Sequence, residues 1–288
     1  MKYAFMMANR REFALAAMCR VFEVSRQGYY DWKKRQVNPS PRVLRRQHLD
    51  GQVATAFKAR KGRSGSPEVA LDLKDAGIHC NRKTVAESMR AQGLRAKAAR
   101  KFKATTNSNH TLPVAPNLLN QDFSASAPNQ KWVGDITYIG TNEGWLYLAV
   151  VIDLYSRRVV GWAMSERMTT PLVCDAMRMA LGARKKPSGV IFHSDRGSQY
   201  CSHEYRRLLK ENSILPSMSA KGNCYDNACA ESFFHSLKVE LIHGEPLKTR
   251  DEMKQAVFEY IEVDYNRNRR HSANGGISPA AFEAKLVA

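Results

Sequence analysis

Three acidic residues stand where they could hold metal ions for phosphodiester chemistry. Asp195 ends the apolar run Val190-Ile191-Phe192, and Glu231 follows after 35 intervening residues, near the start of a predicted helix. Asp135 lies upstream in the middle of a strand-like segment. Hard divalent cations prefer oxygen ligands, and two of them about 4 Å apart stabilise both the attacking and the leaving oxygen. The three carboxylates therefore predict a site for two metal ions, with Asp135, Asp195 and Glu231 as both catalytic residues and ligands.

Each carboxylate taken alone also has a plainer interpretation. An aspartate at a strand end often caps a turn, and a glutamate in a first helical turn often only complements the helix dipole. Asp135 could face solvent on an edge strand. Of the nearby polar residues, Lys238 shares the helix face of Glu231 two turns on, and Asn227 lies one turn before it. We expect Asn227 to contact DNA. We expect His193 to orient its neighbours, Asp153 to lie in a bend after a strand, and Asp226 and Glu240 to serve turns or caps.

The elements that must position these residues begin at Lys131. The expected order is three strands, a helix, a strand, a helix, a strand and a helix that carries Glu231, followed by a long helix. The expected ranges are 132–139, 146–152, 158–164, a helix capped by Thr170, 189–193, 203–212, 215–219 and 250–266. This order is that of a ribonuclease-H-like α/β fold, a mixed five-stranded sheet with flanking helices.

The N-terminal part predicts only helices, in two helix-turn-helix-like pairs over 12–35 and 68–92, with a further basic helix over 42–60. Ser25 and Asn81 are the expected N-caps of the second helix of each pair. Basic residues lie on these second helices, and a basic run follows. We expect DNA contacts from Arg26, Lys33, Arg82, Lys83, Arg100 and Lys101. Plain helical packing and a solvated charged tail explain the same features. The expected domains are 1–103, a proline- and asparagine-rich linker over 104–130, and a catalytic core over 131–288.

The charge is strongly asymmetric along the chain. The net charge is +18, and residues 1–110 hold 24 Lys and Arg against 8 Asp and Glu, whereas the remainder holds 21 against 19. A polycationic half favours binding to nucleic acid, because neutralised phosphates release counterions. We expect no membrane span and no secretion signal, and hence a cytoplasmic protein. The six cysteines form no Cys-x-x-Cys pair, which argues against zinc.

Four segments together resemble bacterial insertion-sequence transposases with a retroviral-integrase-type core, in particular the downstream reading-frame product of elements with two overlapping frames. They are Ala-Pro-Asn-Gln-Lys-Trp-Val-Gly-Asp-Ile-Thr-Tyr (127–138), Val-Ile-Asp-Leu-Tyr-Ser-Arg-Arg-Val-Val-Gly-Trp (151–162), His-Ser-Asp-Arg-Gly-Ser-Gln-Tyr (193–200) and Asp-Asn-Ala-Cys-Ala-Glu-Ser-Phe-Phe (226–234). Tyr-Asn-Arg-Asn-Arg-Arg-His-Ser (265–272) and Ile-Ser-Pro-Ala (277–280) fit as well.

The resemblance implies that the family's Asp-Asp-Glu triad falls on Asp135, Asp195 and Glu231, and that Lys238 contacts DNA near the reacting end. It also implies Mg²⁺, with Mn²⁺ as a substitute. Water would cut at the element end, and the exposed 3′-hydroxyl would then attack target DNA. The implied partners are double-stranded DNA with terminal inverted repeats, further copies of the chain in a homo-oligomer, and the upstream reading-frame product. The implied place of action is the bacterial nucleoid.

Two rival functions fit parts of the same pattern. One is a DNA-binding regulator with a degenerate core, although all three carboxylates are present. The other is a nuclease for RNA–DNA hybrids or DNA junctions with the same fold, although the large basic N-terminal region favours an enzyme that holds DNA ends. We expect the transposase.

Overall fold

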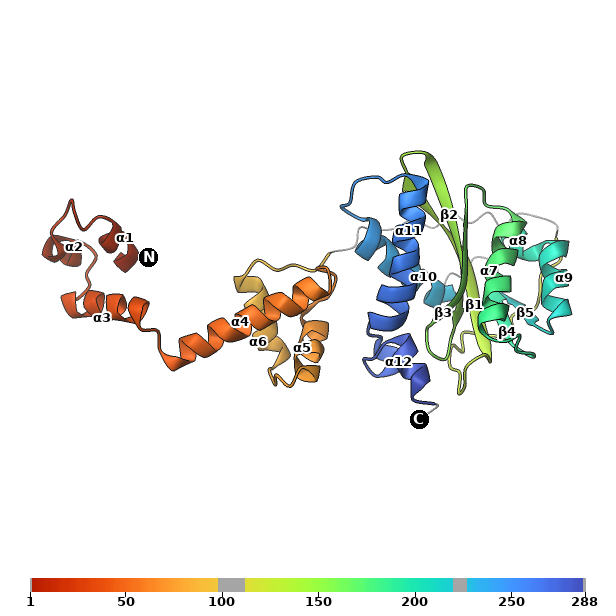
Figure 1. Cartoon of the computed structure of the whole chain (residues 1–288), viewed down its shortest axis with the longest axis horizontal. Helices are drawn as coiled ribbons and strands as arrows, with labels where there is room; N and C mark the ends of the chain where they lie inside the picture. Colours follow the sequence, from red (N-terminus) through yellow and green to blue (C-terminus); the bar gives the residue numbers. More distant parts are fainter. Residues whose placement is uncertain (1, 98–111, 220–226, 287–288) are drawn as a thin grey trace. The chain divides into compact units, whose positions relative to one another are not determined.

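The computed structural model describes residues 2–97, 112–219 and 227–286. The chain divides into two compact units, Met1–Ala96 and Lys97–Ala288, each shown as a ribbon in Figure 1. Arg100 and Lys101 fall outside the described residues, as does Asp226. No helix of the described part is long and apolar enough to cross a membrane.

The first unit begins with three short helices, α1 (Lys2–Ala8), α2 (Leu15–Val21) and α3 (Arg26–Val37). They share a small core in which Met6, Met18 and Tyr29 are buried. The Ser25 hydroxyl accepts a hydrogen bond from the Gly28 amide at 2.9 Å, so the predicted cap of α3 is confirmed. Helix α1 was not predicted.

A second helical cluster completes this unit, with α4 (Pro41–Ala59), α5 (Ser66–Asp75) and α6 (Arg82–Ala91). Its separate core is formed by buried apolar residues of all three helices: Val53, Phe57, Val69, Leu73, Val85 and Met89. The Asn81 side chain accepts from the Lys83 amide at 2.8 Å and caps α6 as predicted. The two cores together account for the all-helical N-terminal region.

The second unit contains a five-stranded mixed sheet, which confirms the predicted fold. Its strands are β1 (Lys131–Thr141), β2 (Gly144–Asp153), β3 (Val159–Ser165), β4 (Ile191–Ser194) and β5 (Leu215–Met218), in the order β3-β2-β1-β4-β5. The first three are antiparallel, whereas β4 runs parallel to β1 and β5 runs parallel to β4. Strand β4 is short and pairs only with residues 131–133 of β1. The rest of that edge of β1 therefore lies beyond the end of β4.

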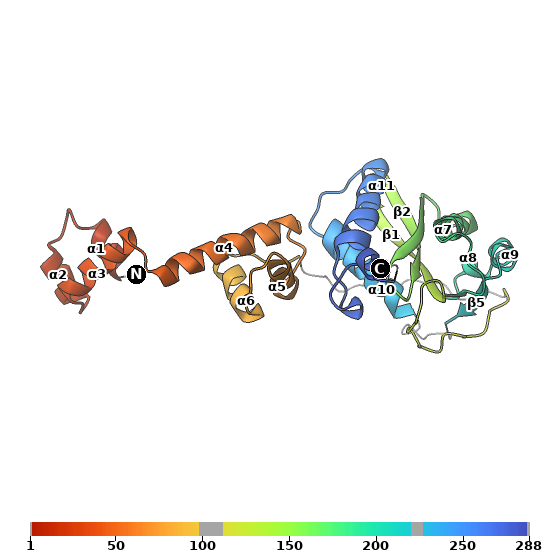
Figure 2. The same cartoon turned by 60° about the horizontal axis from the view of Figure 1, so that its bottom comes forward.

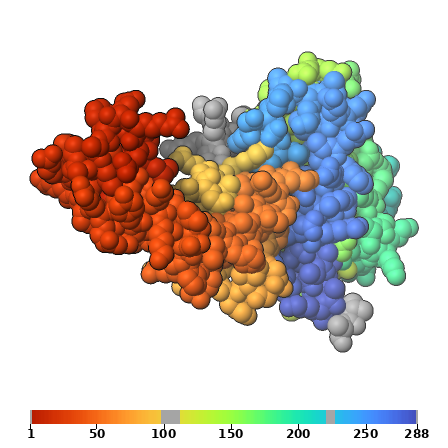
Figure 3. Space-filling view, turned by 60° about the vertical axis from the view of Figure 1, so that its left-hand side comes forward, coloured from red at the N-terminus to blue at the C-terminus, as the bar shows by residue number. Residues whose placement is uncertain are grey.

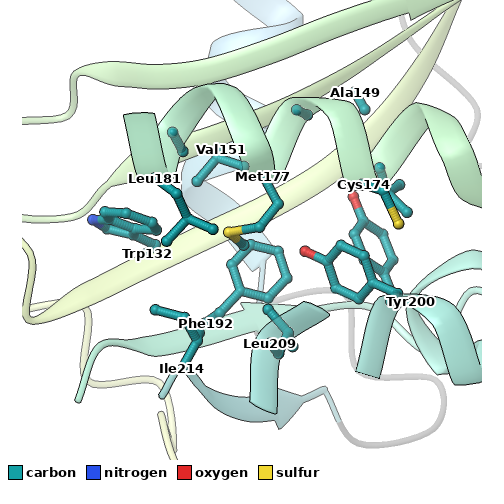
Figure 4. Packing of buried hydrophobic residues seen from close by; sticks show 14 of the residues in the cluster. Trp132, Ala149, Val151, Cys174, Met177, Leu181, Phe192, Tyr200, Leu209 and Ile214 are labelled. Carbon is teal, nitrogen blue, oxygen red and sulfur yellow. The ribbon is translucent and has the colours of Figure 1, made fainter. Parts of the chain in front are cut away.

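Helices cover both faces of the sheet (Figures 1 and 2). On one face lie α7 (Thr170–Ala183), α8 (Ser198–Cys201) and α9 (His203–Glu211). Met177 of α7 shares a core with Trp132 and Phe192 of the sheet (Figure 4). On the other lie α10 (Ala228–Leu237) and α11 (Arg250–Glu259), whose core includes Val133 and Phe233. Each face of β1 is thus buried, and the strand's side chains alternate between two cores.

Some local expectations were wrong. The N-cap of α7 is Thr169 rather than Thr170, because Thr170 is already helical. The long helix expected over 250–266 is α11 followed by a π-helical segment, Tyr260–Asn268. Helix α8 and the C-terminal helix α12 (Pro279–Ala284) were not predicted, since both are too short for a clear apolar period.

The tip of the β1–β2 hairpin is attached to the segment before α11. The Asn142 amide donates to the Lys248 carbonyl at 2.9 Å, and the Asn142 side chain donates to the Leu247 carbonyl at 3.1 Å. In Figure 3 the yellow-green hairpin tip and the blue C-terminal segment lie together at the top of the second unit. The hairpin tip is therefore fixed by tertiary contacts.

Candidate active site

Asp135 is held by β1 on the face that α10 covers. Val133 and Ile139, at even spacing from it along the strand, both belong to the core beneath α10. Its side chain is half-buried, and its Oδ1 atom accepts a hydrogen bond from the Ile136 amide at 2.8 Å. Asp135 is therefore not a solvent-facing residue of an edge strand.

Asp195 is brought beside Asp135 by the parallel pairing of β1 and β4. The register pairs Val133 with His193, and each aspartate lies two residues further along its own chain. The Asp195 Oδ1 atom accepts from the Gly197 amide at 2.9 Å, which fixes the loop after β4. This is the carboxyl end of a parallel strand, a common place for ligand sites in α/β sheets.

Glu231 approaches from α10. Its neighbours Ala230, Phe233 and Phe234 are buried and anchor the helix on the sheet, whereas Glu231 itself is exposed. The spacing of the apolar residues in this helix had predicted that Glu231 lies at the border of the buried face. The core contacts between α10 and β1 thus present Glu231 on the side where Asp135 lies.

The three carboxylates interact electrostatically. Burial raises the pKa of Asp135 well above its usual range, and the negative charges of Asp195 and, more weakly, Glu231 raise it further. Burial also raises the pKa of Glu231. Within the described residues, however, no three His, Cys, Asp or Glu side chains form a ready-made metal cage. The structure thus places Asp135, Asp195 and Glu231 in one neighbourhood, where the negative charges of Asp195 and Glu231 act on Asp135.

Lys238 lies at the point where α10 changes into a π-helical segment, Lys238–Ile242. Its Nζ atom is 4.9 Å from the centroid of the Tyr138 ring. Burial lowers the pKa of Lys238 to about 8, and the charge of Asp135 opposes this decrease. A π-helical turn often marks a functional position in a helix, and Lys238 is the first residue of this one.

Asn227 is buried directly before α10. Its side-chain amide donates to the Gly134 carbonyl at 3.3 Å and so connects the start of α10 to β1 beside Asp135. A DNA contact by Asn227 remains a prediction, whereas a role in fixing α10 follows from this bond.

His193 and the other acids have structural partners. The fully buried His193 ring is hydrogen-bonded through Nδ1 to Ser217 and through Nε2 to Ser219, so both nitrogens are engaged by hydroxyl groups. Asp153, at the end of β2, accepts from the amides of Asn129 and Tyr155. These bonds agree with the structural roles that we expected.

Glu240 was expected in a turn or cap, which is wrong. It lies inside the π-helical segment after α10, where it accepts from the Tyr260 hydroxyl at 2.9 Å and from Arg269 Nε at 3.0 Å. The sequence signal for this pairing is weak, because the partners are 20 and 29 residues away.

The predicted DNA contacts of the first unit are exposed. Arg26 and Lys33 lie on α3, and Arg82 and Lys83 lie in the first turn of α6, all open to solvent. Sequence reasoning missed the pair formed by Tyr138 and Trp145, whose ring centroids are 4.9 Å apart beside Lys238. The available signal was a tryptophan placed directly after the Asn142-Glu143-Gly144 turn, outside the apolar run of its strand.

Family models match both units of the chain. Two models described as integrase core domains match residues 125–224 and 231–286, and an HTH-like domain matches residues 44–102, which include α5 and α6. The mixed sheet and the matched core define an integrase-type enzyme, a polynucleotidyl transferase.

Sequence similarity to individual proteins identifies the family within this class. The chain is 58% identical to the Escherichia coli K12 transposase InsF of insertion sequence IS3A, over all of both chains. It is 48% identical to an uncharacterized 31 kDa protein of insertion element IS600 from Shigella sonnei, over 93% of this chain and 98% of that one. The chain belongs to the IS3 family of insertion-sequence transposases.

Solved integrase structures are more distant. The catalytic core domain of HTLV-2 integrase in complex with magnesium aligns with 56% of this chain and 99% of its own, at 16% identity and a TM-score of 0.41. A simian T-cell lymphotropic virus intasome aligns with 80% of this chain and 74% of its own, at 16% identity and a TM-score of 0.47.

Proposed function

We propose that this transposase cuts DNA at the ends of its insertion element and joins those ends to target DNA by two-metal phosphoryl transfer. The observation that supports the reaction most directly is the crowding of negative charge at Asp135. A half-buried carboxylate beside two others is costly unless a cation compensates it. The cost is reasonable for a site whose function requires a bound cation.

The donor set fits hard divalent ions, because all three side chains offer carboxylate oxygens. Asp135, Asp195 and Glu231 would hold two Mg²⁺ ions, with Mn²⁺ as a substitute. The exposed Glu231 would complete this ligand set from the first turn of α10. When bound, two such ions polarise the phosphodiester and stabilise both the attacking and the leaving oxygen.

The protein's own groups position the DNA. The Lys238 ammonium would contact a phosphate next to the reacting bond. His193 needs no role as a general base, because both of its ring nitrogens bond serine hydroxyls. The attacking oxygen is first that of water, which exposes a 3′-hydroxyl at the element end, and then that of this 3′-hydroxyl, which attacks the target strand.

The first unit would bind the terminal inverted repeats through Arg26, Lys33, Arg82 and Lys83, with Arg100 and Lys101 following the phosphates. We also propose that the DNA-binding region ends at residue 103 and that a linker over 104–130 joins it to the catalytic core. A second copy of the chain, and the upstream reading-frame product, would assemble with it so that two element ends are held together at the target DNA.

Strand transfer tests the reaction. We expect the wild type with Mg²⁺ to join a labelled terminal-repeat duplex to plasmid DNA. Asp135→Asn, Asp195→Asn and Glu231→Gln should each abolish joining and cleavage but keep end binding within a few-fold. Glu211→Gln, at an exposed position on α9, is the matched control and should retain activity.

Other outcomes would contradict the proposal or support one of the two alternative functions. Wild-type activity in any one of the three variants would refute the triad. Cleavage without joining by the wild type would indicate a nuclease. DNA binding with neither reaction would indicate a regulator.

A further inference from the structure

Three apolar side chains form an exposed patch at the tip of the β1–β2 hairpin, which we call the hairpin patch: Tyr138, Trp145 and Leu247. Trp145 is 53% exposed and Leu247 is 60% exposed. The rings of Tyr138 and Trp145 meet edge to face. A contiguous apolar patch on a surface indicates a binding site more strongly than scattered single residues do.

Gly140 keeps the centre of this patch open. A Cβ atom added there would lie 3.7 Å from Trp145 and 3.9 Å from Leu247, so the glycine faces the space between them. Its backbone φ is not in the positive range, and hence the conformation of the strand does not require glycine. Glycine at this position therefore leaves the Trp145 and Leu247 side chains uncovered by any side chain of residue 140.

The patch is rigid. Asn142 bonds the carbonyl groups of Leu247 and Lys248, and Glu143 accepts from the Arg250 amide at 2.6 Å. Glu166, the other nearby acid, is paired with Arg250 Nη1 at 3.0 Å. Both acidic groups are thereby engaged by Arg250, which reduces their repulsion of an anionic ligand.

Lys238 connects the patch to the catalytic carboxylates. Its ammonium group lies over the Tyr138 ring and within electrostatic reach of Asp135. Tyr138 follows Asp135 by three residues of the same strand, so the two side chains leave opposite faces of β1, and Lys238 is the group that reaches both. A DNA phosphate bound to Lys238 would therefore lie beside the Tyr138 ring and its neighbour Trp145.

We propose that Tyr138 and Trp145 form a stacking site for an unpaired nucleotide of the DNA strand that Lys238 holds. An aromatic surface beside a cation is the combination that binds single-stranded nucleic acid, because the ring stacks on a base and the cation binds the backbone phosphate. This inference rests on the proposed function. It adds that the enzyme separates the terminal nucleotides of the element end and holds one of them on Trp145.

A fluorescent base tests stacking without chemistry. The full chain is mixed, in Ca²⁺ to prevent reaction, with a terminal-repeat duplex that carries 2-aminopurine at each of the last positions of the joined strand. We expect wild-type protein to quench the fluorescence at one position. Trp145→Ala should abolish this quenching and weaken end binding by about 5- to 150-fold, whereas Trp145→Phe should retain most of both.

The matched control is Phe258→Ala on α11. Phe258 is also an aromatic residue, 52% exposed, and lies away from the patch, so this variant should behave as the wild type. The Trp145→Ala variant should keep the wild-type salt dependence of binding, because it loses no charge. Its circular dichroism should match that of Phe258→Ala.

The possible failures are distinguishable. Equal quenching and affinity in Trp145→Ala and Phe258→Ala would overturn the stacking site, even if joining is normal. Wild-type quenching that Trp145→Ala removes, with no joining in Mg²⁺, would refute the proposed reaction and keep the stacking site. Normal DNA binding by Trp145→Ala together with a lost self-association would assign the patch to a protein partner instead.

Discussion

Lys238 loses its proton more readily than an exposed lysine does. Burial lowers its pKa to about 8, although the nearby Asp135 carboxylate favours the charged form. A DNA phosphate that binds this ammonium group gains a contact close to the reacting carboxylates, and the contact depends on protonation. The residue therefore provides both a salt-dependent and a pH-dependent test of the site.

We expect Lys238→Ala to weaken end binding and to lower the slope of log affinity against log salt by about one unit, because one phosphate contact is lost. As pH rises from 7 to 9, wild-type lysine loses its proton, so its contribution to affinity should decline. The DNA affinity of the Lys238→Arg variant should not change over this pH range, because arginine stays charged.

Fluorescence anisotropy at several salt concentrations and pH values measures both effects. Lys210→Ala, an exposed position on α9, is the control for loss of a surface charge and should leave the slope unchanged. A Lys238→Ala variant with the wild-type slope would remove this residue from the DNA contacts.

At the scale of elements, the site depends on close packing of helices against the sheet. Strand β3 and helix α7 approach each other at Gly161, where a Cβ atom would collide with the Ala176 carbonyl oxygen and lie 2.6 Å from the Ala180 amide nitrogen. These are backbone atoms of a packed helix and cannot turn away as a flexible side chain could. Glycine at this position allows α7 to cover the sheet next to β2 and β1.

Gly161→Ala should therefore destabilise the catalytic unit by about 2–3 kcal/mol, through overpacking, and lower its Tm by roughly 5–10 °C. Gly182→Ala is the matched control. Gly182 lies on α7, the helix that packs against Gly161, and a Cβ atom at Gly182 would meet nothing within 4 Å. It should be neutral or stabilising by up to about 1 kcal/mol. Thermal unfolding monitored by circular dichroism measures both, and equal Tm values would contradict the close approach.

At the scale of the whole molecule, charge and chemistry are divided between two units. The N-terminal 110 residues carry 24 basic against 8 acidic residues, whereas Asp135, Asp195 and Glu231 lie in the other, nearly neutral part. If the basic residues bind phosphates and the three carboxylates hold the metal ions, as we propose, DNA binding and catalysis can be weakened separately. This separation suits an enzyme that must hold long DNA while it reacts at one bond.

We expect the combined change of Arg26, Lys33, Arg82 and Lys83 to glutamine to lower the salt slope by roughly 3 to 4 units, since each lost phosphate contact contributes about 0.9. The rate of joining by this variant should be low at limiting DNA concentration. It should recover at high DNA concentration, because the variant keeps Asp135, Asp195 and Glu231. The control changes Arg207 and Lys210 on α9 in the same way and should bind as the wild type. Joining that stays low at saturating DNA would place these residues in the catalytic step.

The sequence by itself determined the main strands and helices, the fold and the place of each acidic residue within its element, whereas the short helices α1, α8 and α12 were not predicted. Strand-like apolar segments marked β1 to β3, an aspartate followed the buried run of β4, and helical spacing placed Glu231 at the edge of a buried face. These are local properties, because strand and helix periods and cap residues depend on a few neighbouring side chains. The family resemblance connected them to one reaction.

Only the tertiary structure decided which distant side chains meet. The register of β1 with β4 sets Asp195 beside Asp135. Lys238 lies over Tyr138, a residue 100 positions earlier in the chain, and Glu240 in the same π-helical segment is bonded to Tyr260 and Arg269. The exposure of Trp145 depends on the segment before α11, more than 100 residues away. Such contacts follow from packing between elements and leave no period in the sequence, because the partners are free to lie anywhere along the chain.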